Sequence, residues 1–140
     1  MEITTKWKEL EFDKIIQLFD AVGWSAYTQN PAELKTAFEN SSYVLIGKVN
    51  SEVVAALRSL SDNVSIHHLQ DILISPAYQG KGFGKQMLNM ALEHYAHVRT
   101  HLLLTDDEEK QHKFYKSLGY QNVKEVTSPH LNSFVKFKQS

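Results

Sequence analysis

The residues best suited to chemistry form a short glycine-rich loop, Gln79-Gly80-Lys81-Gly82-Phe83-Gly84. It follows the apolar run Ile72-Leu73-Ile74 and precedes a segment with helical apolar spacing, so it lies between a predicted strand and a predicted helix. Glycines let the backbone turn sharply and aim several N–H groups at one anion, and a helix N-terminus attracts the same charge. Lys81 and Lys85 add positive charge. The pattern therefore predicts a pyrophosphate site.

Two nucleotide-binding motifs and a ligand-free turn are the alternatives for this loop. A dinucleotide fingerprint needs G-x-G-x-x-G in a first strand–helix–strand unit, whereas the glycines here run G-x-G-x-G after three predicted antiparallel strands. A P-loop ends in G-K-[ST], whereas Gly84-Lys85 is followed by Gln86. Spacing excludes both nucleotide motifs. It does not exclude a tight turn that binds nothing.

Metal and thiolate chemistry are not predicted. The sequence contains no cysteine, which excludes disulfides and cysteine nucleophiles. His67 and His68 are adjacent on a predicted strand, so their side chains point to opposite faces unless a bulge shifts the register. Since no third ligand is evident, we expect no metal site.

The elements that position the loop indicate an α+β (mixed α/β) domain with a central, mostly antiparallel sheet. Three strands joined by short turns form an antiparallel meander, and a strand, crossover helix and further strand pair in parallel around the loop. The predicted strands are residues 3–8, 43–49, 53–60, 64–74, 101–105, 120–126 and 134–137, and the predicted helices are residues 10–23, a segment from 30, 81–97 and 106–119.

Composition predicts a single domain over residues 1–140 in a soluble, cytoplasmic protein. The net charge is −1, with lysine and arginine dispersed, which does not indicate a nucleic-acid surface. No apolar run approaches the roughly 20 residues that span a bilayer, and the N-terminus resembles neither a signal nor a transit peptide. We therefore expect no membrane partner.

Three motifs resemble the GNAT superfamily of N-acetyltransferases. Gln79–Gly84 matches the acetyl-CoA signature [QR]-x-x-G-x-[GA] at every defined position, and residues 69–78 resemble the family's fourth strand and the approach to the loop. Phe114-Tyr115-Lys116-Ser117-Leu118-Gly119-Tyr120 is similar to the F-Y-x-x-x-G-[FY] motif of its fourth helix. The element order agrees along all 140 residues. The resemblance implies a twisted sheet of about seven strands, with one splayed parallel pair and about four flanking helices.

The same resemblance implies a binding mode for acetyl-CoA as co-substrate, without a metal. The pantetheine arm would enter the gap between the splayed strands and pair with the backbone of Ile72 and Ile74, where one N–H would polarise the thioester carbonyl. The pyrophosphate would bind the N–H groups from Gly80 to Lys85. The expected cofactor-binding residues are Ile72, Leu73, Ile74, Gln79, Gly80, Lys81, Gly82, Phe83, Gly84, Lys85 and Tyr115.

Catalytic roles follow from the resemblance as well. Tyr115 would give a proton to the coenzyme A sulfur; its structural alternative is packing on the sheet. His68 lies 11 residues before Gln79, where some members carry a Glu or His base, and Gln70 on the same strand face would help to hold a water. Asp71 is a second candidate base, with a bracing role as its alternative, and a water chain is a third. Glu108 stands where the family commonly has an Asn that contacts the cofactor.

The implied activity is transfer of an acetyl group to a primary amine of a small molecule or peptide by direct attack. Trp24 and Tyr27 border the acceptor region in the family and offer aromatic walls to a protonated amine, or else they cap the core. A non-catalytic module that binds or senses acyl-CoA is the alternative function. Dimers are common in the family, so a homodimer is consistent with the resemblance.

Overall fold

The computed structural model describes residues 1–139, which divide into a first compact unit, Met1–Leu104, and a second that begins at Thr105. The first unit holds one mixed sheet whose strands lie in chain order, β1-β2-β3-β4-β5. Neighbouring strands pair antiparallel except β4 and β5, which are parallel. The strands are β1 (Glu2–Thr4), β2 (Tyr43–Val49), β3 (Glu52–Ser61), β4 (Ile66–Ile74) and β5 (Thr100–Leu103).

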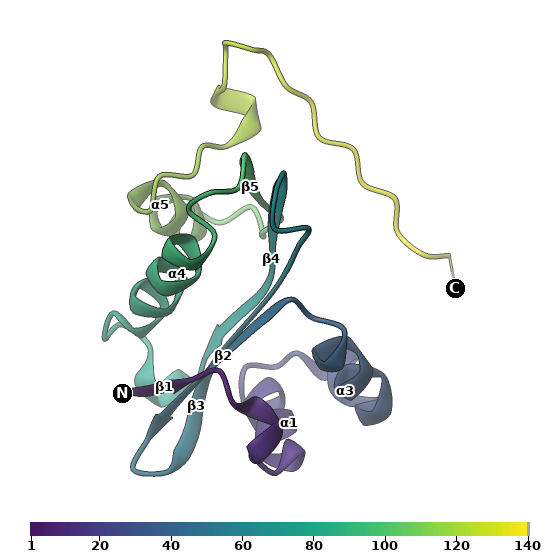
Figure 1. Cartoon of the computed structure of the whole chain (residues 1–140), viewed down its shortest axis with the longest axis vertical. Coiled ribbons are helices and arrows are strands. Elements are labelled where there is room, and N and C mark those ends of the chain that lie inside the picture. The colour runs from purple at the N-terminus through teal and green to yellow at the C-terminus, as the bar shows by residue number, and fades with distance from the viewer. Residues whose placement is uncertain (140) are drawn as a thin grey trace. The chain divides into compact units, whose positions relative to one another are not determined.

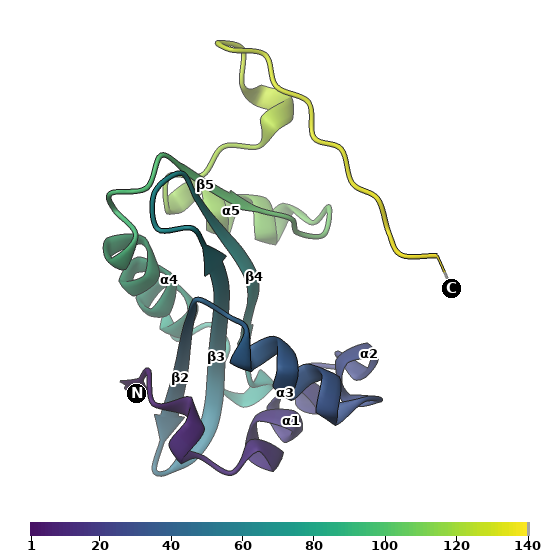
Figure 2. The same ribbon diagram turned by 45° about the vertical axis from the view of Figure 1, so that its right-hand side comes forward.

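Helices cover both faces of this sheet (Figures 1 and 2): α1 and α3 lie on one face and α4 on the other. On the first face an aromatic cluster that includes Trp7, Phe19 and Phe38 packs on the apolar residues of β2 and β3. On the second face Met87 and Leu88 of α4 are fully buried. The helical elements are η1 (Trp7–Glu9), α1 (Phe12–Ala21), α2 (Ser25–Thr28), α3 (Pro31–Glu39), η2 (Pro76–Tyr78) and α4 (Phe83–His94).

Local sequence signals account for several element boundaries. Gly23 has φ +81° and follows α1, and the Asn30 side chain accepts a hydrogen bond from the Glu33 N–H at the start of α3, as both residue types predicted. Asn50 and Ser51 both have positive φ, which matches the turn between two twisted antiparallel strands. Within the described chain no helix has the length and apolar content needed to cross a membrane.

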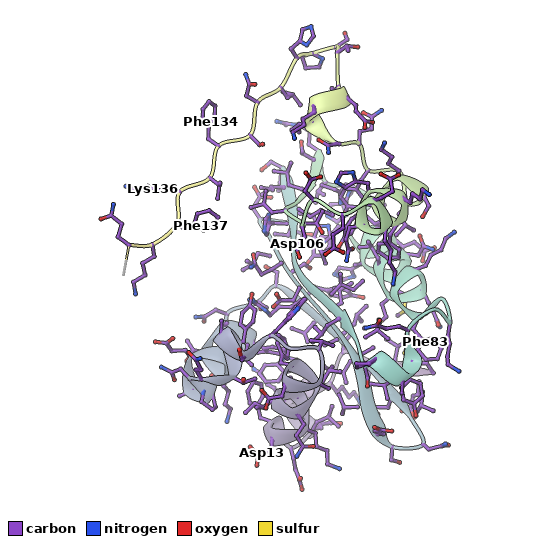
Figure 3. All side chains as sticks on the ribbon, turned by 180° about the vertical axis from the view of Figure 1, so that it is seen from behind. Asp13, Phe83, Asp106, Phe134, Lys136 and Phe137 are labelled. Atoms are coloured by element: carbon purple, nitrogen blue, oxygen red, sulfur yellow. The ribbon has the colours of Figure 1, made fainter. Side chains whose placement is uncertain are left out.

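The second unit contains α5 (Glu109–Ser117) and the short η3 (Val123–Glu125). Two predicted strands, residues 120–126 and 134–137, are not formed, so residues 1–139 contain five strands rather than about seven, with five α-helices rather than about four. An extended segment gains ladder hydrogen bonds only from a neighbouring strand, and the C-terminal segment has none within the described chain. Phe134 and Phe137 project from this segment (Figure 3), and they are 94% and 79% exposed.

Candidate active site

The glycine-rich loop links β4 to α4 through two left-handed glycines. Gly80 has φ +78° and Gly82 has φ +82°, and Gly82 is the N-cap of α4 without a side chain to cap it. The first N–H that bonds back into this turn belongs to Gln86, which donates to the Gly82 carbonyl at 3.1 Å. The N–H groups of Phe83, Gly84 and Lys85 therefore have no such helical acceptor. They form the N-terminal end of a 12-residue helix, an arrangement that favours an anion, with Lys81 and Lys85 exposed beside it.

Open space surrounds the two glycines. A Cβ built on Gly80 or Gly82 would meet no atom within 4 Å, so it is the positive φ and not crowding that restricts these positions. Phe83 lies at the start of α4 (Figure 3), and its ring stacks near Tyr78 with centroids 6.3 Å apart.

Gln79 braces the end of β4. Its side-chain amide donates to the Ile74 carbonyl at 3.0 Å, which explains a structural need for glutamine at the first position of the motif.

The edge of β4 that faces β5 is paired along only part of its length. Parallel pairing joins Ile66–Leu69 to Thr100–Leu103. Within residues 1–139 the rest of β4, through Ile72, Leu73 and Ile74, pairs as a strand only with β3. Its other edge has no partner strand in the stretch predicted to bind the pantetheine arm, although the Ile74 carbonyl already accepts from Gln79.

A β-bulge at Gln70 reverses the side of the sheet that the following side chains of β4 face. Arg58 pairs with Asp71 and Ser59 pairs with Leu69, which leaves Gln70 as the extra residue. His68 and Gln70 share one side, where His68 Nε2 lies 3.1 Å from Gln70 Oε1. Because of the extra residue, Asp71 faces this side too, whereas strict alternation would have turned it away. The sequence predicted the first pair but not the addition of Asp71.

Asp71 belongs to a buried polar network. Its side chain is 3% exposed; Oδ2 accepts from Arg58 Nε at 2.8 Å, and Oδ1 accepts from the Tyr27 hydroxyl at 3.0 Å. Arg58 also donates to Ser41 Oγ at 3.4 Å and lies over the Phe38 ring. Asp71 accepts two hydrogen bonds, one of which is its ion pair with Arg58, and this arrangement favours the bracing role of Asp71 over that of a free base. Arg58 was missed in the sequence, although a lone charge inside the apolar predicted strand 53–60 was a usable signal.

The predicted acceptor walls are tied to the core. Trp24 and Tyr27 are half-buried and pack on Phe19, with ring centroids 5.9 and 5.3 Å away. Burial raises the pKa of Tyr27, which a hydrogen bond to Gln70 lowers in part. Tyr27 is therefore a neutral phenol at physiological pH. Both residues cap the core, and Tyr27 also reaches the side of β4 that carries His68.

The opposite side of β4 carries a pair of histidines, His67 and His101. His67 is fully buried, its Nδ1 lies 2.9 Å from Nδ1 of His101 in β5, and its ring stacks on Tyr95 with centroids 4.4 Å apart. Burial, together with the charges of His101, His68 and His94, lowers the pKa of His67 to about 4. Among residues 1–139 no three His, Asp or Glu side chains gather as metal ligands. His67 and His101 are neutral imidazoles at physiological pH, because the pKa of each is lowered, and their contact links β4 to β5.

Tyr115 lies in α5 of the second unit. Its ring contacts Phe114 and Tyr120, with centroids 5.1 and 5.8 Å away. Burial raises the pKa of Tyr115, while a hydrogen bond to Thr105 lowers it in part, and burial raises the pKa of Tyr120 to about 12. Tyr115 thus keeps its proton at neutral pH and is chemically able to donate it. Glu108 is the N-cap of α5 and makes no side-chain cap hydrogen bond.

Comparisons with known proteins match most of the chain to acetyltransferases. A family model described as the acetyltransferase (GNAT) family matches residues 7–120. A Pyropia yezoensis protein named an uncharacterized N-acetyltransferase is 31% identical over 118 residues, which are 81% of this chain and 66% of that protein. A Gibberella zeae protein named for acetyltransferase activity is 40% identical over 77 residues, 53% of this chain and 42% of that protein. The chain thus spans less than two thirds of the length of either relative.

Solved structures agree on the fold. A GNAT-family acetyltransferase structure from Streptococcus pneumoniae TIGR4 superposes with a TM-score of 0.81 at 22% identity, over 99% of this chain and 97% of the other. At that identity the likeness concerns the fold alone. It supports an α+β architecture in which one parallel strand pair is embedded in an otherwise antiparallel sheet.

Proposed function

This chain belongs to the acetyltransferase (GNAT) family, and on that basis we propose that it transfers the acetyl group of acetyl-CoA to a primary amine of a small molecule or peptide. The observation that carries the proposal is the loop after β4, where Gly82 starts α4 in a left-handed conformation and leaves first-turn N–H groups without helical acceptors. A helix N-terminus flanked by two lysines favours a pyrophosphate. We propose further that residues 1–140 work as one acetyltransferase domain, in the cytoplasm.

The proposed cofactor contacts follow the loop and the open edge of β4. The pyrophosphate would bind the N–H groups from Gly80 to Lys85, with Lys81 as a neighbouring cation. The pantetheine arm would pair with the backbone of Ile72 and Ile74, whose edge toward β5 has no partner strand. In this proposal Gln79 acts indirectly, since its amide holds the end of β4 through the Ile74 carbonyl.

The proposed chemistry is direct transfer without a covalent enzyme intermediate. The amine nitrogen forms a bond to the acetyl carbonyl carbon and gives its proton to His68, and the carbon–sulfur bond breaks as Tyr115 gives its hydroxyl proton to the sulfur. A backbone N–H of β4 stabilises the oxygen of the tetrahedral intermediate. The sequence has no cysteine, so a thiolate cannot carry the acetyl group. Tyr27, Trp24 and Gln70 would form part of the acceptor wall.

A release assay for free thiol tests the proposal. Acetyl-CoA is incubated with the protein and a panel of primary amines that includes polyamines, amino sugars, arylalkylamines and N-terminal peptides. We expect thiol release that depends on one class of amine, and a rise in melting temperature with coenzyme A because a ligand that binds the folded state stabilises it. A melting shift without thiol release from any amine would point to the acyl-CoA-binding module instead. Absence of both results would refute the proposed function.

A further inference from the structure

Polar contacts attach the short helix α2 to the end of α1. Thr28 Oγ1 donates to Asp20 Oδ1 at 2.5 Å. The Trp24 N–H donates to the Phe19 carbonyl at 3.0 Å, and the Trp24 and Tyr27 rings pack on the Phe19 ring. Asp20 and Phe19 both belong to α1, so these contacts alone do not attach α2 to the sheet.

The bond between Tyr27 and Asp71 attaches α2 to the sheet. The Tyr27 hydroxyl donates to Asp71 Oδ1 at 3.0 Å, which joins α2 to β4. The Asp71 carboxylate is held in place, because it is 3% exposed and its Oδ2 accepts from Arg58 Nε at 2.8 Å. A charged acceptor makes a hydrogen bond roughly twice as strong as a neutral one. The buried ion pair therefore gives Tyr27 a strong acceptor in a fixed place.

The backbone around α2 does not fix the position of this helix. α2 has four residues, far fewer than an isolated helix needs to be stable. Gly23 precedes it with φ +81° and with open space where a Cβ would lie, so the chain can pivot at Gly23 without a clash. The position of α2 therefore depends on its side-chain contacts.

The attachment lies on the side of β4 that carries the candidate base. The bulge at Gln70 turns Asp71 to the side of His68 and Gln70. Tyr27 reaches Asp71 from this side. The bond thus holds α2 beside the part of β4 to which an amine must come to meet His68.

We propose that Asp71 is a positioning residue, which holds α2 at the His68 side of β4 through the Tyr27 hydroxyl and thereby sets the affinity for the amine. The inference rests on the proposed function, in which His68 is the base and Trp24 and Tyr27 form part of the acceptor wall. An amine held by this wall binds only the attached form of α2, so its apparent affinity falls with the fraction of molecules in which the bond is made. The proposed contacts with acetyl-CoA do not involve α2.

Hydrogen–deuterium exchange tests the attachment without any substrate. The Gln29 N–H donates to the Ser25 carbonyl at 3.0 Å, so it is protected only while α2 is formed. Tyr27→Phe keeps the ring and removes the hydroxyl, and we expect it to speed exchange at Gln29 roughly tenfold. The Tyr95 N–H donates to the Ala91 carbonyl at the end of α4, and it should keep its exchange rate as the internal reference.

Steady-state kinetics test the consequence for the amine that the thiol-release panel identifies. Tyr27→Phe should raise the KM for this amine roughly fivefold, with the KM for acetyl-CoA unchanged. The double variant Arg58→Met with Asp71→Leu removes the acceptor but keeps Tyr27, and its apolar side chains can replace the buried ion pair. It should reproduce both effects. Adding Tyr27→Phe to it should change neither effect further, because the bond is already lost.

Tyr43→Phe is the matched control. Tyr43 is half-buried and loses the same hydroxyl, but its ring stacks on His94 of α4 with centroids 4.3 Å apart. It should leave the exchange at Gln29 and the KM for the amine unchanged. Equal exchange at Gln29 in the wild type and in Tyr27→Phe would overturn the inference. A further rise of the KM in the triple variant would overturn it too, since the hydroxyl would then contact the amine itself.

The inference and the proposed function can fail separately. If exchange at Gln29 responds but the wild type acetylates no amine, the proposed function is wrong and the attachment of α2 stands. If an amine is acetylated and its KM does not respond to Tyr27→Phe, the positioning role alone is wrong. If the double variant does not fold, the comparison of Tyr27→Phe with Tyr43→Phe decides both questions.

Discussion

The fully buried His67 should make the stability of the first unit depend on pH between about 4 and 6.5. Its pKa is lowered to about 4 in the folded state, from an ordinary value of about 6.5. Between these values the unfolded chain binds more protons than the folded one. The free energy of unfolding is therefore highest above pH 6.5, falls as the pH drops toward 4, and stops falling below it.

The size of the effect follows from the two values. Linkage gives almost no loss at pH 7.5, a loss of about 2 kcal/mol at pH 5, and a limit of roughly 3 kcal/mol below pH 4. Burial lowers the pKa of His101 as well, which adds in the same direction. Asp62, whose pKa is lowered by hydrogen bonds from Ser65 and neighbouring backbone N–H groups, loses its contribution only at more acidic pH. The interval between pH 7.5 and 5 therefore isolates the histidines.

Urea denaturation at the two pH values tests this account in the wild type, in His67→Leu and in His130→Gln. Leucine fills much of the same volume without a titratable group, so the loss between pH 7.5 and 5 should shrink by about 2 kcal/mol. His130 is an exposed histidine of the second unit, so its variant should keep the wild-type loss. Equal losses in the wild type and in His67→Leu would refute the reasoning.

Three further predictions concern the network, the loop and α5. Arg58→Met leaves the Asp71 carboxylate buried without its cation, so it should lower the free energy of unfolding in urea by about 3–5 kcal/mol. The double variant Arg58→Met with Asp71→Leu should recover most of this loss. Equal losses in the single and the double variant would contradict a buried ion pair. Gly82→Ala forces a side chain into φ +82°, so it should cost about 1–2 kcal/mol and abolish the coenzyme A melting shift, which a Lys110→Ala control should keep. Tyr115→Phe should lower kcat by roughly 100-fold with the KM for acetyl-CoA unchanged, and unchanged turnover would remove Tyr115 from the chemistry.

Local patterns in the sequence were sufficient for most of the first unit, although α2 (Ser25–Thr28) was not predicted and the first strand ends at Thr4 rather than at residue 8. Alternating and helical apolar spacing predicted the strands from Tyr43 to Ile74 and the helix after the loop, because each of these segments buries one face against a neighbour close in the chain. The C-terminal strands were wrong for the opposite reason. Residues 120–126 and 134–137 have strand-like composition, but pairing requires a distant partner, and a local Asn122 cap begins η3 instead.

The sequence alone predicted the loop of the candidate site, but it did not predict the polar network around Asp71. The glycines and Gln79 are contiguous, so their geometry follows from a few neighbouring residues. Arg58 and Asp71 are 13 residues apart, and only the register between β3 and β4 shows that they meet. A bulge leaves no reliable mark in a single sequence, since any residue type can be the extra one at a sheet position of this kind.

Because of that bulge, His67 and Asp71 face opposite sides of the sheet, although both are in β4. N-terminal to Gln70, β4 pairs with β5 and turns His67 toward α4, where a neutral histidine pair fastens the two strands together. C-terminal to it, the strand leaves β5 and turns Asp71 toward Tyr27, so that His68, Gln70 and Asp71 act on one side. Without the extra residue Asp71 would face α4 and could not reach Tyr27. The insertion of one residue therefore places Asp71 on the same side of β4 as His68 and Gln70, which is the side proposed to meet the acceptor.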